Sequence, residues 1–346
     1  MAEANQPATR VAIVGCGAVA AQHAAAVHRL PDDIQLVACA DVVHERADAF
    51  AHEHNVPRMY GDYRRMVESE SPDLVIITTW PVQHEMQVFT CVDLGAKAVL
   101  CHPPLAMHVA AAAAVGRAAR EAGTLVAESL PWRHHPRILA ALDLLHAGRL
   151  GDLQQVRVGI RLNREKLRPW RTRVEYGGGV AFDLLCAMLH AATACLPDGP
   201  IIATAEADRL PDGVIESLRG TLRVDEAGPT AEVEASFGEK HEEWLKLIGS
   251  EATVRVTEPW KSGDGGALEV VRDEQVETPE VEAGDAHECQ LLHLRARLAD
   301  GESPRIPIAR SIAVAAARDA MLTASRTDRP VPARIPSDFA PSQPAT

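Results

Sequence analysis

A glycine-cornered turn that directly follows an apolar run constrains the fold of this chain more than any other feature. Residues 11–14 read Val-Ala-Ile-Val and end at Gly15, as a buried parallel strand does. In a turn of G-x-G-x-x-A spacing, the first glycine permits a tight bend and the second leaves the backbone open to a pyrophosphate. The amides of the helix that follows then face the phosphates. We therefore expect a dinucleotide to bind at Gly15, Cys16, Gly17, Ala18 and Val19.

An acidic residue stands about twenty residues beyond this turn, the distance at which dinucleotide-binding folds place one. Residues 34–39 form a second strand-like run, and Asp41 follows it. A carboxylate at this point can accept hydrogen bonds from the adenosine ribose, and it repels a 2′-phosphate. The sequence therefore predicts NAD as the cofactor, with NADP disfavoured. The alternative is that Asp41 only ends the strand.

Composition and charge exclude several classes of protein. The 346 residues are enough for two domains, and a net charge of -13 argues against nucleic acid as a partner. No window reaches the ~18 uninterrupted apolar residues of a membrane helix, and residues 1–10 contain no hydrophobic signal region, so we expect a cytoplasmic protein. The seven cysteines form no C-x-x-C pair and the histidines no H-E-x-x-H motif, so we expect free thiols and no metal site.

Strand-like and helix-like stretches alternate as far as residue 127. Further strands are expected at 74–78, 98–101 and 124–127, and helices at 44–54, 85–94 and 106–122. This alternation predicts an α/β fold in which residues 1–127 form an NAD-binding Rossmann domain with a doubly wound parallel sheet.

The second half of the chain has a different pattern. Residues 156–162 alternate between apolar and polar side chains, as a half-buried strand does, and similar runs recur at 201–208, 216–224, 229–237, 243–248 and 252–257. Helices are expected at 136–146, 180–196, 287–299 and 309–325. Residues 128–335 are therefore predicted to form a substrate and oligomerisation domain with a mainly antiparallel sheet. The Pro- and Ser-containing residues 336–346 are expected to be a disordered tail.

Three residues after the strand at 74–78 are candidates for the cofactor site. Open α/β sheets bind ligands at the carboxyl ends of their strands, where Thr79 and Trp80 stand. His84 follows closely. It either contacts the cofactor or starts the next helix.

Four stretches together resemble the glucose-fructose oxidoreductase and inositol dehydrogenase family, Gfo/Idh/MocA, over residues 10–333. They are VAIVGCG at 11–17, AKAVLC at 96–101 before a prolyl turn, ESLPWRHHP at 128–136, and the triple glycine 177–179 with Asp183. The third looks like the subgroup of sugar and dihydrodiol dehydrogenases. The resemblance implies a nicotinamide cofactor and a C-terminal α/β domain whose open sheet often mediates homodimer or homotetramer contacts.

The chain departs from the family at two catalytic positions. Where the family usually reads Glu-Lys-Pro, this chain reads His102-Pro103-Pro104, so the proton-handling lysine is absent. Asp183 is kept, but the His or Tyr expected four residues later is Ala187. We hypothesise that Asp183 with His190 or His102 forms a replacement acid/base set, because His190 would lie on the same helical face. The alternative is that His190 packs in the helix and His102 is an ordinary loop residue, which could still line the cofactor.

Four further residues are candidates for substrate contacts. By the resemblance, Arg133 and His134 lie in the stretch near the substrate, or they fix the junction of the two domains. Trp170 and Tyr176 lie in or next to a basic segment, in which Trp170 could stack on a ring or simply pack. This segment is positively charged in an otherwise acidic protein, so it could attract an anionic substrate. Alternatively, it is a solvated loop. Its cations are Arg164, Lys166, Arg168, Arg171 and Arg173.

The sequence favours an NAD(P)-dependent oxidoreductase that transfers a hydride between nicotinamide and a small polar molecule such as a sugar, a cyclitol, or a cyclic imine or ketone. Loss of the lysine argues against routine alcohol oxidation, which needs a base beside the hydroxyl proton. Two alternatives remain: a redox-neutral lyase, epimerase or hydrolase with tightly bound NAD, and a non-catalytic nucleotide-binding protein.

Overall fold

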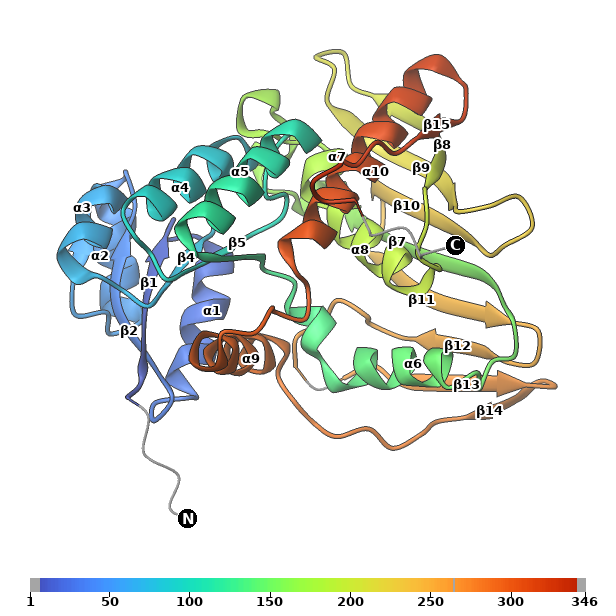
Figure 1. Cartoon of the computed structure of the whole chain (residues 1–346), viewed down its shortest axis with the longest axis horizontal. Coiled ribbons are helices and arrows are strands. Elements are labelled where there is room, and N and C mark those ends of the chain that lie inside the picture. The colour runs from blue at the N-terminus through green and yellow to red at the C-terminus, as the bar shows by residue number, and fades with distance from the viewer. Residues whose placement is uncertain (1–6, 264, 341–346) are drawn as a thin grey trace. The chain divides into compact units, whose positions relative to one another are not determined.

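The computed structural model describes residues 7–263 and 265–340. The chain forms two compact units, whose elements are labelled in Figure 1. Unit 1 comprises Met1–Leu105, Ala114–Ser129 and His287–Ile308. Unit 2 comprises Ala106–Ala113, Leu130–Ala286 and Ala309–Thr346.

Unit 1 contains a six-stranded parallel sheet with the strand order β3-β2-β1-β4-β5-β6. The strands are β1 Thr9–Val14, β2 Ile34–Ala40, β3 Met59–Tyr60, β4 Leu74–Ile77, β5 Ala98–Cys101 and β6 Leu125–Glu128. Strands β4 and β5 are buried at every residue, which explains why their sequences are continuous apolar runs. The predicted doubly wound parallel sheet is confirmed.

Helices cover this sheet, and three of them share one hydrophobic cluster on one face. The helices are α1 Ala18–His28, α2 His44–Glu53, α3 Tyr63–Glu70, α4 Pro81–Asp93, α5 Val109–Ala122 and α9 Ala286–Asp300. Helices α1, α2 and α9 contribute side chains to the cluster that contains Val11 and Ile13 of β1. Helix α4 begins at Pro81, earlier than predicted, because proline is well suited to the first turn of a helix.

Helix α9 lies within unit 1 from His287 onwards, although the sequence assigned this stretch to the second domain. The reason is its packing. Leu291 and Leu294 are 1% and 2% exposed and belong to the same cluster as Val11. An apolar stripe on a helix does not specify which of two cores will bury it.

Unit 2 contains a nine-stranded sheet with the order β14-β13-β12-β11-β7-β10-β9-β8-β15. Only β10 and β7 pair in parallel, so the predicted mainly antiparallel sheet is confirmed. The strands are β7 Leu153–Asn163, β8 Ile202–Arg209, β9 Ile215–Arg223, β10 Thr230–Gly238, β11 Glu242–Gly249, β12 Thr253–Val256, β13 Leu268–Arg272, β14 Gln275–Glu277 and β15 Val331–Pro332.

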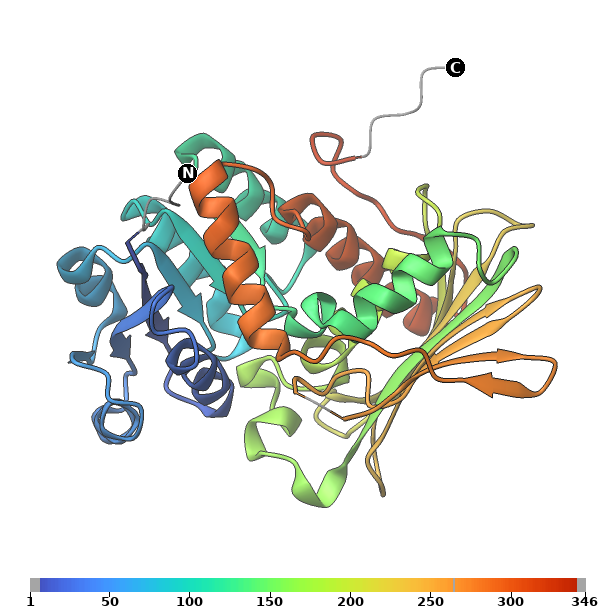
Figure 2. The same ribbon diagram turned by 90° about the horizontal axis from the view of Figure 1, so that it is seen from below.

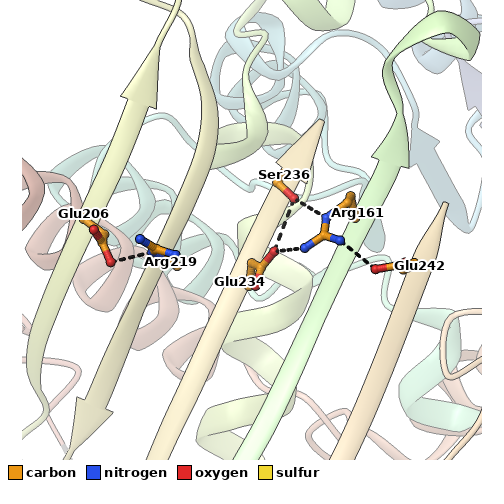
Figure 3. Close-up of polar contacts among 6 residues, drawn as sticks. All are labelled: Arg161, Glu206, Arg219, Glu234, Ser236 and Glu242. Carbon is orange, nitrogen blue, oxygen red and sulfur yellow. Dashed lines mark hydrogen bonds and ion pairs between the residues drawn. The ribbon is translucent and has the colours of Figure 1, made fainter. Parts of the chain in front are cut away.

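The two faces of this sheet differ. The helices of unit 2 lie on one face (Figure 2), and they are α6 Pro136–His146, α7 Val180–Asp183, α8 Leu185–Cys195 and α10 Ile308–Thr327. The other face carries charged side chains that pair across strands (Figure 3). Arg161 on β7 donates to Glu234 on β10 at 2.8 Å and to Glu242 on β11 at 2.6 Å. Arg219 on β9 pairs with Glu206 on β8.

The predicted helix at 180–196 is interrupted. Helix α7 ends at Asp183 and α8 begins at Leu185, with φ -116° and ψ -42° at Leu184 between them. The surrounding stretch Val174–Cys195 has the length and hydropathy of a membrane span, but 78% of its most apolar window is buried inside the protein. This degree of burial is typical of a helix in the core of a folded domain.

Residues 336–340, the last that the structure describes, form a turn. Ala340 N donates to Pro336 O at 3.0 Å, and the Phe339 side chain is 8% exposed. Residues 341–346 of the tail predicted to be disordered lie outside the described residues.

Candidate functional site

The two glycines of the turn between β1 and α1 differ in what surrounds them. Gly15 has φ +90°, and a Cβ built there would lie 2.8 Å from Cγ2 of Thr79. Gly17 is the N-cap of α1 and has an ordinary extended backbone, with no side-chain cap. A Cβ at Gly17 would meet nothing within 4 Å. The start of α1 is therefore an exposed, uncapped helix end, with the exposed Ala18 and the half-buried Val19 as its first residues.

Asp41 lies beside this turn. Its Oδ2 accepts a hydrogen bond from the backbone N–H of Cys16 at 3.0 Å, and its Oδ1 accepts one from Val43 N at 2.8 Å. The two bonds fix the carboxylate at the carboxyl end of β2, and each oxygen has a lone pair left for another donor. The arrangement fits a dinucleotide, because open backbone amides and a fixed acceptor are the groups that a pyrophosphate and a ribose require.

Residues after β4 support the turn from the other side. The hydroxyl of Thr78 donates to Gly15 O at 2.7 Å. Thr79 contributes the methyl group that would meet a Cβ at Gly15, and the half-buried Trp80 is the N-cap of α4. The predicted residues Thr79 and Trp80 thus lie at the carboxyl end of β4, next to the turn.

His84 is buried within the first turn of α4, after the helix has begun. Its Nδ1 lies 2.8 Å from Pro104 O and its Nε2 lies 3.0 Å from Thr79 O. Burial lowers the pKa of this imidazole, while the two carbonyl oxygens oppose that shift. The ring links the β4–α4 turn to the loop after β5, so its packing role is the one these contacts support.

His102 begins the loop after β5. Its backbone N–H donates to Ile77 O at 2.8 Å, and the residue is half-buried. The loop continues through Pro103 and Pro104, and Leu105 N donates to Oε1 of the buried Glu128 at 2.7 Å. Pro103 offers no side-chain proton donor.

In unit 2, Arg133 and His134 belong to a short 3₁₀ helix, Pro131–His134. The guanidinium of Arg133 lies 5.8 Å from the ring centroid of Trp132, which contacts Trp260 edge to face at 4.8 Å. His134 is only 5% exposed. Both residues are therefore tied into local packing.

Asp183 is the buried carboxylate of unit 2, and its partner is Arg171. The side chain of Asp183 is 4% exposed, whereas that of Arg171 is 24% exposed. Burial raises the pKa of Asp183 to about 6, although the charge and hydrogen bond of Arg171 pull it downward. A carboxyl group with this pKa can exchange a proton near neutral pH.

The proposed partnership of Asp183 with His190 is not formed by a hydrogen bond among the described residues, since Asp183 bonds to Arg171. The common helical face expected for Asp183 and His190 stays a prediction, since α7 ends at Asp183 and α8 begins at Leu185, while Leu184 between them keeps a right-handed helical backbone. His190 is 2% exposed within α8. No group of three or more potential metal ligands occurs in the described part of the chain.

Trp170 and Tyr176 flank the arginine that pairs with Asp183. The Arg171 guanidinium lies 5.2 Å from the Trp170 ring centroid, and Tyr176 is half-buried at the end of a 3₁₀ turn. Nothing in the sequence distinguishes Arg171 from the other cations of its basic segment. The available signal was the position of that segment directly before the triple glycine.

Two family models match the chain. The model described as "Oxidoreductase family, NAD-binding Rossmann fold" matches residues 9–129, and "GFO/IDH/MocA C-terminal domain" matches residues 138–255. Together they span the Rossmann sheet and much of the second sheet.

Individual relatives share about a quarter to a third of their aligned residues with this chain. The chain is 30% identical over 174 residues to trans-1,2-dihydrobenzene-1,2-diol dehydrogenase of Bos taurus, a match that covers 50% of this chain and 52% of that protein. It thus spans about half the length of the dihydrodiol dehydrogenases that it matches. It is 26% identical to D-xylose 1-dehydrogenase (NADP(+)) 2 of Haloferax volcanii, over 82% of this chain and 87% of that one.

Solved structures share the fold. The aldose-aldose oxidoreductase from Caulobacter crescentus complexed with glycerol superimposes with a TM-score of 0.84 at 20% identity, over 94% of this chain and 99% of that chain. A 3-ketoreductase from Actinomadura kijaniata, in complex with NADP and TDP-benzene, gives 0.83 at 20% identity, over 92% and 98%.

Proposed function

Because the chain belongs to the Gfo/Idh/MocA oxidoreductase family, we propose that it is an NAD(P)-dependent oxidoreductase that transfers a hydride between nicotinamide and a small polar substrate. The substrate class is a sugar, a cyclitol, or a cyclic imine or ketone. One observation carries the proposal: the Asp41 carboxylate is fixed 3.0 Å from the Cys16 amide, beside the uncapped start of α1.

The residues of unit 1 have separate tasks in holding the cofactor, which would accept or donate the hydride. The amides at the start of α1 receive the phosphates, because Gly17 has no side chain to cover them. Asp41 accepts hydrogen bonds from the ribose hydroxyl groups and repels a 2′-phosphate. We therefore propose that NAD is preferred over NADP.

Asp183 is the acid/base group of the proposed reaction. Its pKa of about 6 lets it hold a proton in weakly acidic solution and accept one near neutral pH. His190 or His102 is its proposed proton partner, through water or a moving side chain. Substitution of each by alanine should lower kcat more than it changes KM, and unchanged turnover in both variants would remove the histidines from the mechanism.

The relatives support the substrate class. The names of two of them, a dihydrodiol dehydrogenase and a D-xylose dehydrogenase, specify substrates with neighbouring hydroxyl groups. We propose the same chemistry for this chain, with Arg133, His134, Trp170 and Tyr176 as candidate substrate contacts.

A homodimer or homotetramer in the cytoplasm completes the proposal. Support comes from the sheet face of unit 2 that its helices leave uncovered and from seven free cysteines, which suit a reducing compartment. Light scattering coupled to size exclusion should give a mass of two or four chains, whereas a single chain would exclude self-association.

The direct test uses the purified full chain. Fluorescence titration should show binding of NADH at least about tenfold tighter than binding of NADPH, because the 2′-phosphate would face Asp41. Incubation of NAD⁺ with a panel of sugars, cyclitols and diols should then produce NADH, with Asp183 as the base that accepts the hydroxyl proton in place of the absent lysine. Absence of binding to either reduced nucleotide would refute the proposal.

A further inference from the structure

We propose that Arg171 anchors an oxyanion group of the substrate, a carboxylate or a phosphate, so that the enzyme acts on acidic polyols rather than on neutral ones. This inference rests on the proposed function and narrows its substrate class. It starts from the donors that Arg171 leaves unused.

The guanidinium of Arg171 is only partly occupied. A guanidinium has five N–H donors, and within residues 7–263 and 265–340 only Nη1 is bonded, to Asp183. Nη2 and Nε have no hydrogen-bonded partner there, and the side chain keeps 24% of its surface exposed. These two nitrogens form the edge that binds a carboxylate or phosphate through two parallel hydrogen bonds.

The arginine is also held in place before any ligand arrives. Gly179 N donates to Arg171 O at 2.7 Å, and Gly178 N donates to Arg173 O at 2.9 Å. A Cβ at Gly178 would lie 2.6 Å from Trp170 O, so this segment rests directly on the glycine backbone. The Trp170 ring, 5.2 Å from the guanidinium carbon, further restricts the side chain. A donor fixed in this way loses little entropy on binding.

The surrounding charge favours an anion. The segment 164–173 has five cations and one acid in a chain of net charge -13. Arg164 is paired with Glu216, and Arg173 lies 3.5 Å from Glu175. Lys166 and Arg168 are exposed and form no ion pair with a described residue, so positive potential remains around Arg171.

Asp183 does not cancel this attraction. Burial holds the pKa of its carboxyl at about 6, so a second anion close by raises that pKa further and the carboxyl takes up a proton. Repulsion between the two anions is therefore reduced at every pH below this raised pKa. The affinity for the anionic ligand should accordingly increase as the pH falls from about 8 to about 6.

The experiment compares three ligands that share one ring: D-glucose, D-glucuronate and D-glucose 6-phosphate. Each is titrated by calorimetry into the full chain saturated with NAD⁺, and NADH formation is recorded separately. At least one anion should bind about tenfold more tightly than glucose, as expected for a charged hydrogen-bonded pair. Glucuronate and glucose 6-phosphate distinguish a carboxylate from a phosphate as the recognised group.

Variants assign the effect to the guanidinium. Arg171→Gln should lose about tenfold in affinity for the preferred anion and less than about twofold for glucose. Arg171→Lys keeps the charge but not the planar donors. Its affinity for the preferred anion should lie between that of wild type and that of Arg171→Gln. Arg297→Gln is the matched control, since Arg297 is 23% exposed and pairs with Asp300 at 2.6 Å, and it should behave as wild type.

The outcomes separate this inference from the proposed function. Equal affinity for glucose and both anions, or an anion preference that survives in Arg171→Gln, would overturn the inference while NADH binding still supports an oxidoreductase. Loss of NADH binding by wild type would refute the proposed function instead. If Arg171→Gln does not fold because Asp183 is left without its partner, Arg171→Lys and the double variant Arg171→Gln/Asp183→Asn supply the same comparison in binding.

Discussion

Two glycines of the β1–α1 turn should respond to the same substitution in opposite ways. Alanine at Gly15 should damage the fold, because the residue has φ +90° and its Cβ would lie 2.8 Å from Thr79 Cγ2 and 3.1 Å from Thr78 C. Alanine at Gly17 should leave the fold intact and damage cofactor binding. Its backbone is at φ -100° and ψ -170°, and nothing lies within 4 Å of the added carbon.

The expected magnitudes follow from these distances. A left-handed backbone costs a residue with a Cβ roughly 1–2 kcal/mol, and overpacking against a fixed neighbour adds about 1–3 kcal/mol. Gly15→Ala should therefore lower the free energy of unfolding by about 2–5 kcal/mol. Gly17→Ala should change it by less than about 1 kcal/mol, because the loss of chain entropy in the unfolded state offsets the slightly poorer N-cap.

Two measurements on each variant test this contrast. Urea unfolding gives the change in stability, and NADH fluorescence titration gives the change in affinity, which should fall at least about tenfold in Gly17→Ala. The double variant Gly15→Ala/Thr79→Ser removes the methyl group that the new Cβ would meet. It should recover about 1 kcal/mol or more of the stability lost in Gly15→Ala.

Wild-type affinity for NADH in a folded Gly17→Ala protein would refute the reasoning, because a side chain would then be tolerated where the phosphates are proposed to lie. An unperturbed stability in Gly15→Ala would show that the turn can relax away from Thr79.

Three further predictions concern single side chains. Asp41→Ser should weaken NADH binding about tenfold and should reduce or reverse the preference for NADH over NADPH, because the ribose acceptor and the repulsive charge are both lost. Fluorescence titration with each nucleotide measures both affinities. Because burial raises the pKa of Asp183 from 3.8 to about 6, the folded state should lose about 3 kcal/mol of stability as pH rises through this range. Unfolding free energies of Asp183→Asn between about pH 4 and about pH 7 should lack this component, and parallel wild-type and variant curves would contradict it. Arg318→Met should destabilise the protein by about 1–3 kcal/mol in urea unfolding, because Ala106 O loses the guanidinium donor that now lies 3.0 Å away.

The centre of the Rossmann sheet could be predicted closely from the sequence because β4 and β5 are buried at every residue. Such strands appear as continuous apolar runs, and the runs at 74–78 and 98–101 correspond to β4 and β5. Alternation similarly identified β9, β10 and β11. The short strands β3, β14 and β15 carry too few residues to show any period, and they were missed.

Long-range packing could not be predicted in the same way. The helical pattern of α9 is local, but its assignment to unit 1 depends on a cluster with residues almost three hundred positions away. The interruption at Leu184 is not marked in the sequence because no Gly or Pro occurs in or between Val180–Asp183 and Leu185–Cys195.

In the candidate site, too, local patterns could be predicted from the sequence and long-range contacts could not. Gly15, Gly17 and Asp41 could be predicted because backbone geometry and spacing determine their types, and their role in cofactor binding stays a prediction. The pairing of Asp183 with Arg171 depends on the irregular path of residues 164–176, which no periodicity encodes. Sequence reasoning proposed His190 as the proton partner from helical spacing alone, and that role stays a prediction.

A crystal structure of the full chain with NAD⁺ tests the central claim most directly. The account predicts electron density for the pyrophosphate against the N-terminus of α1 and for the adenosine ribose within hydrogen-bonding distance of Asp41. A nucleotide bound elsewhere, or a well-ordered turn without nucleotide at saturating concentration, would contradict it.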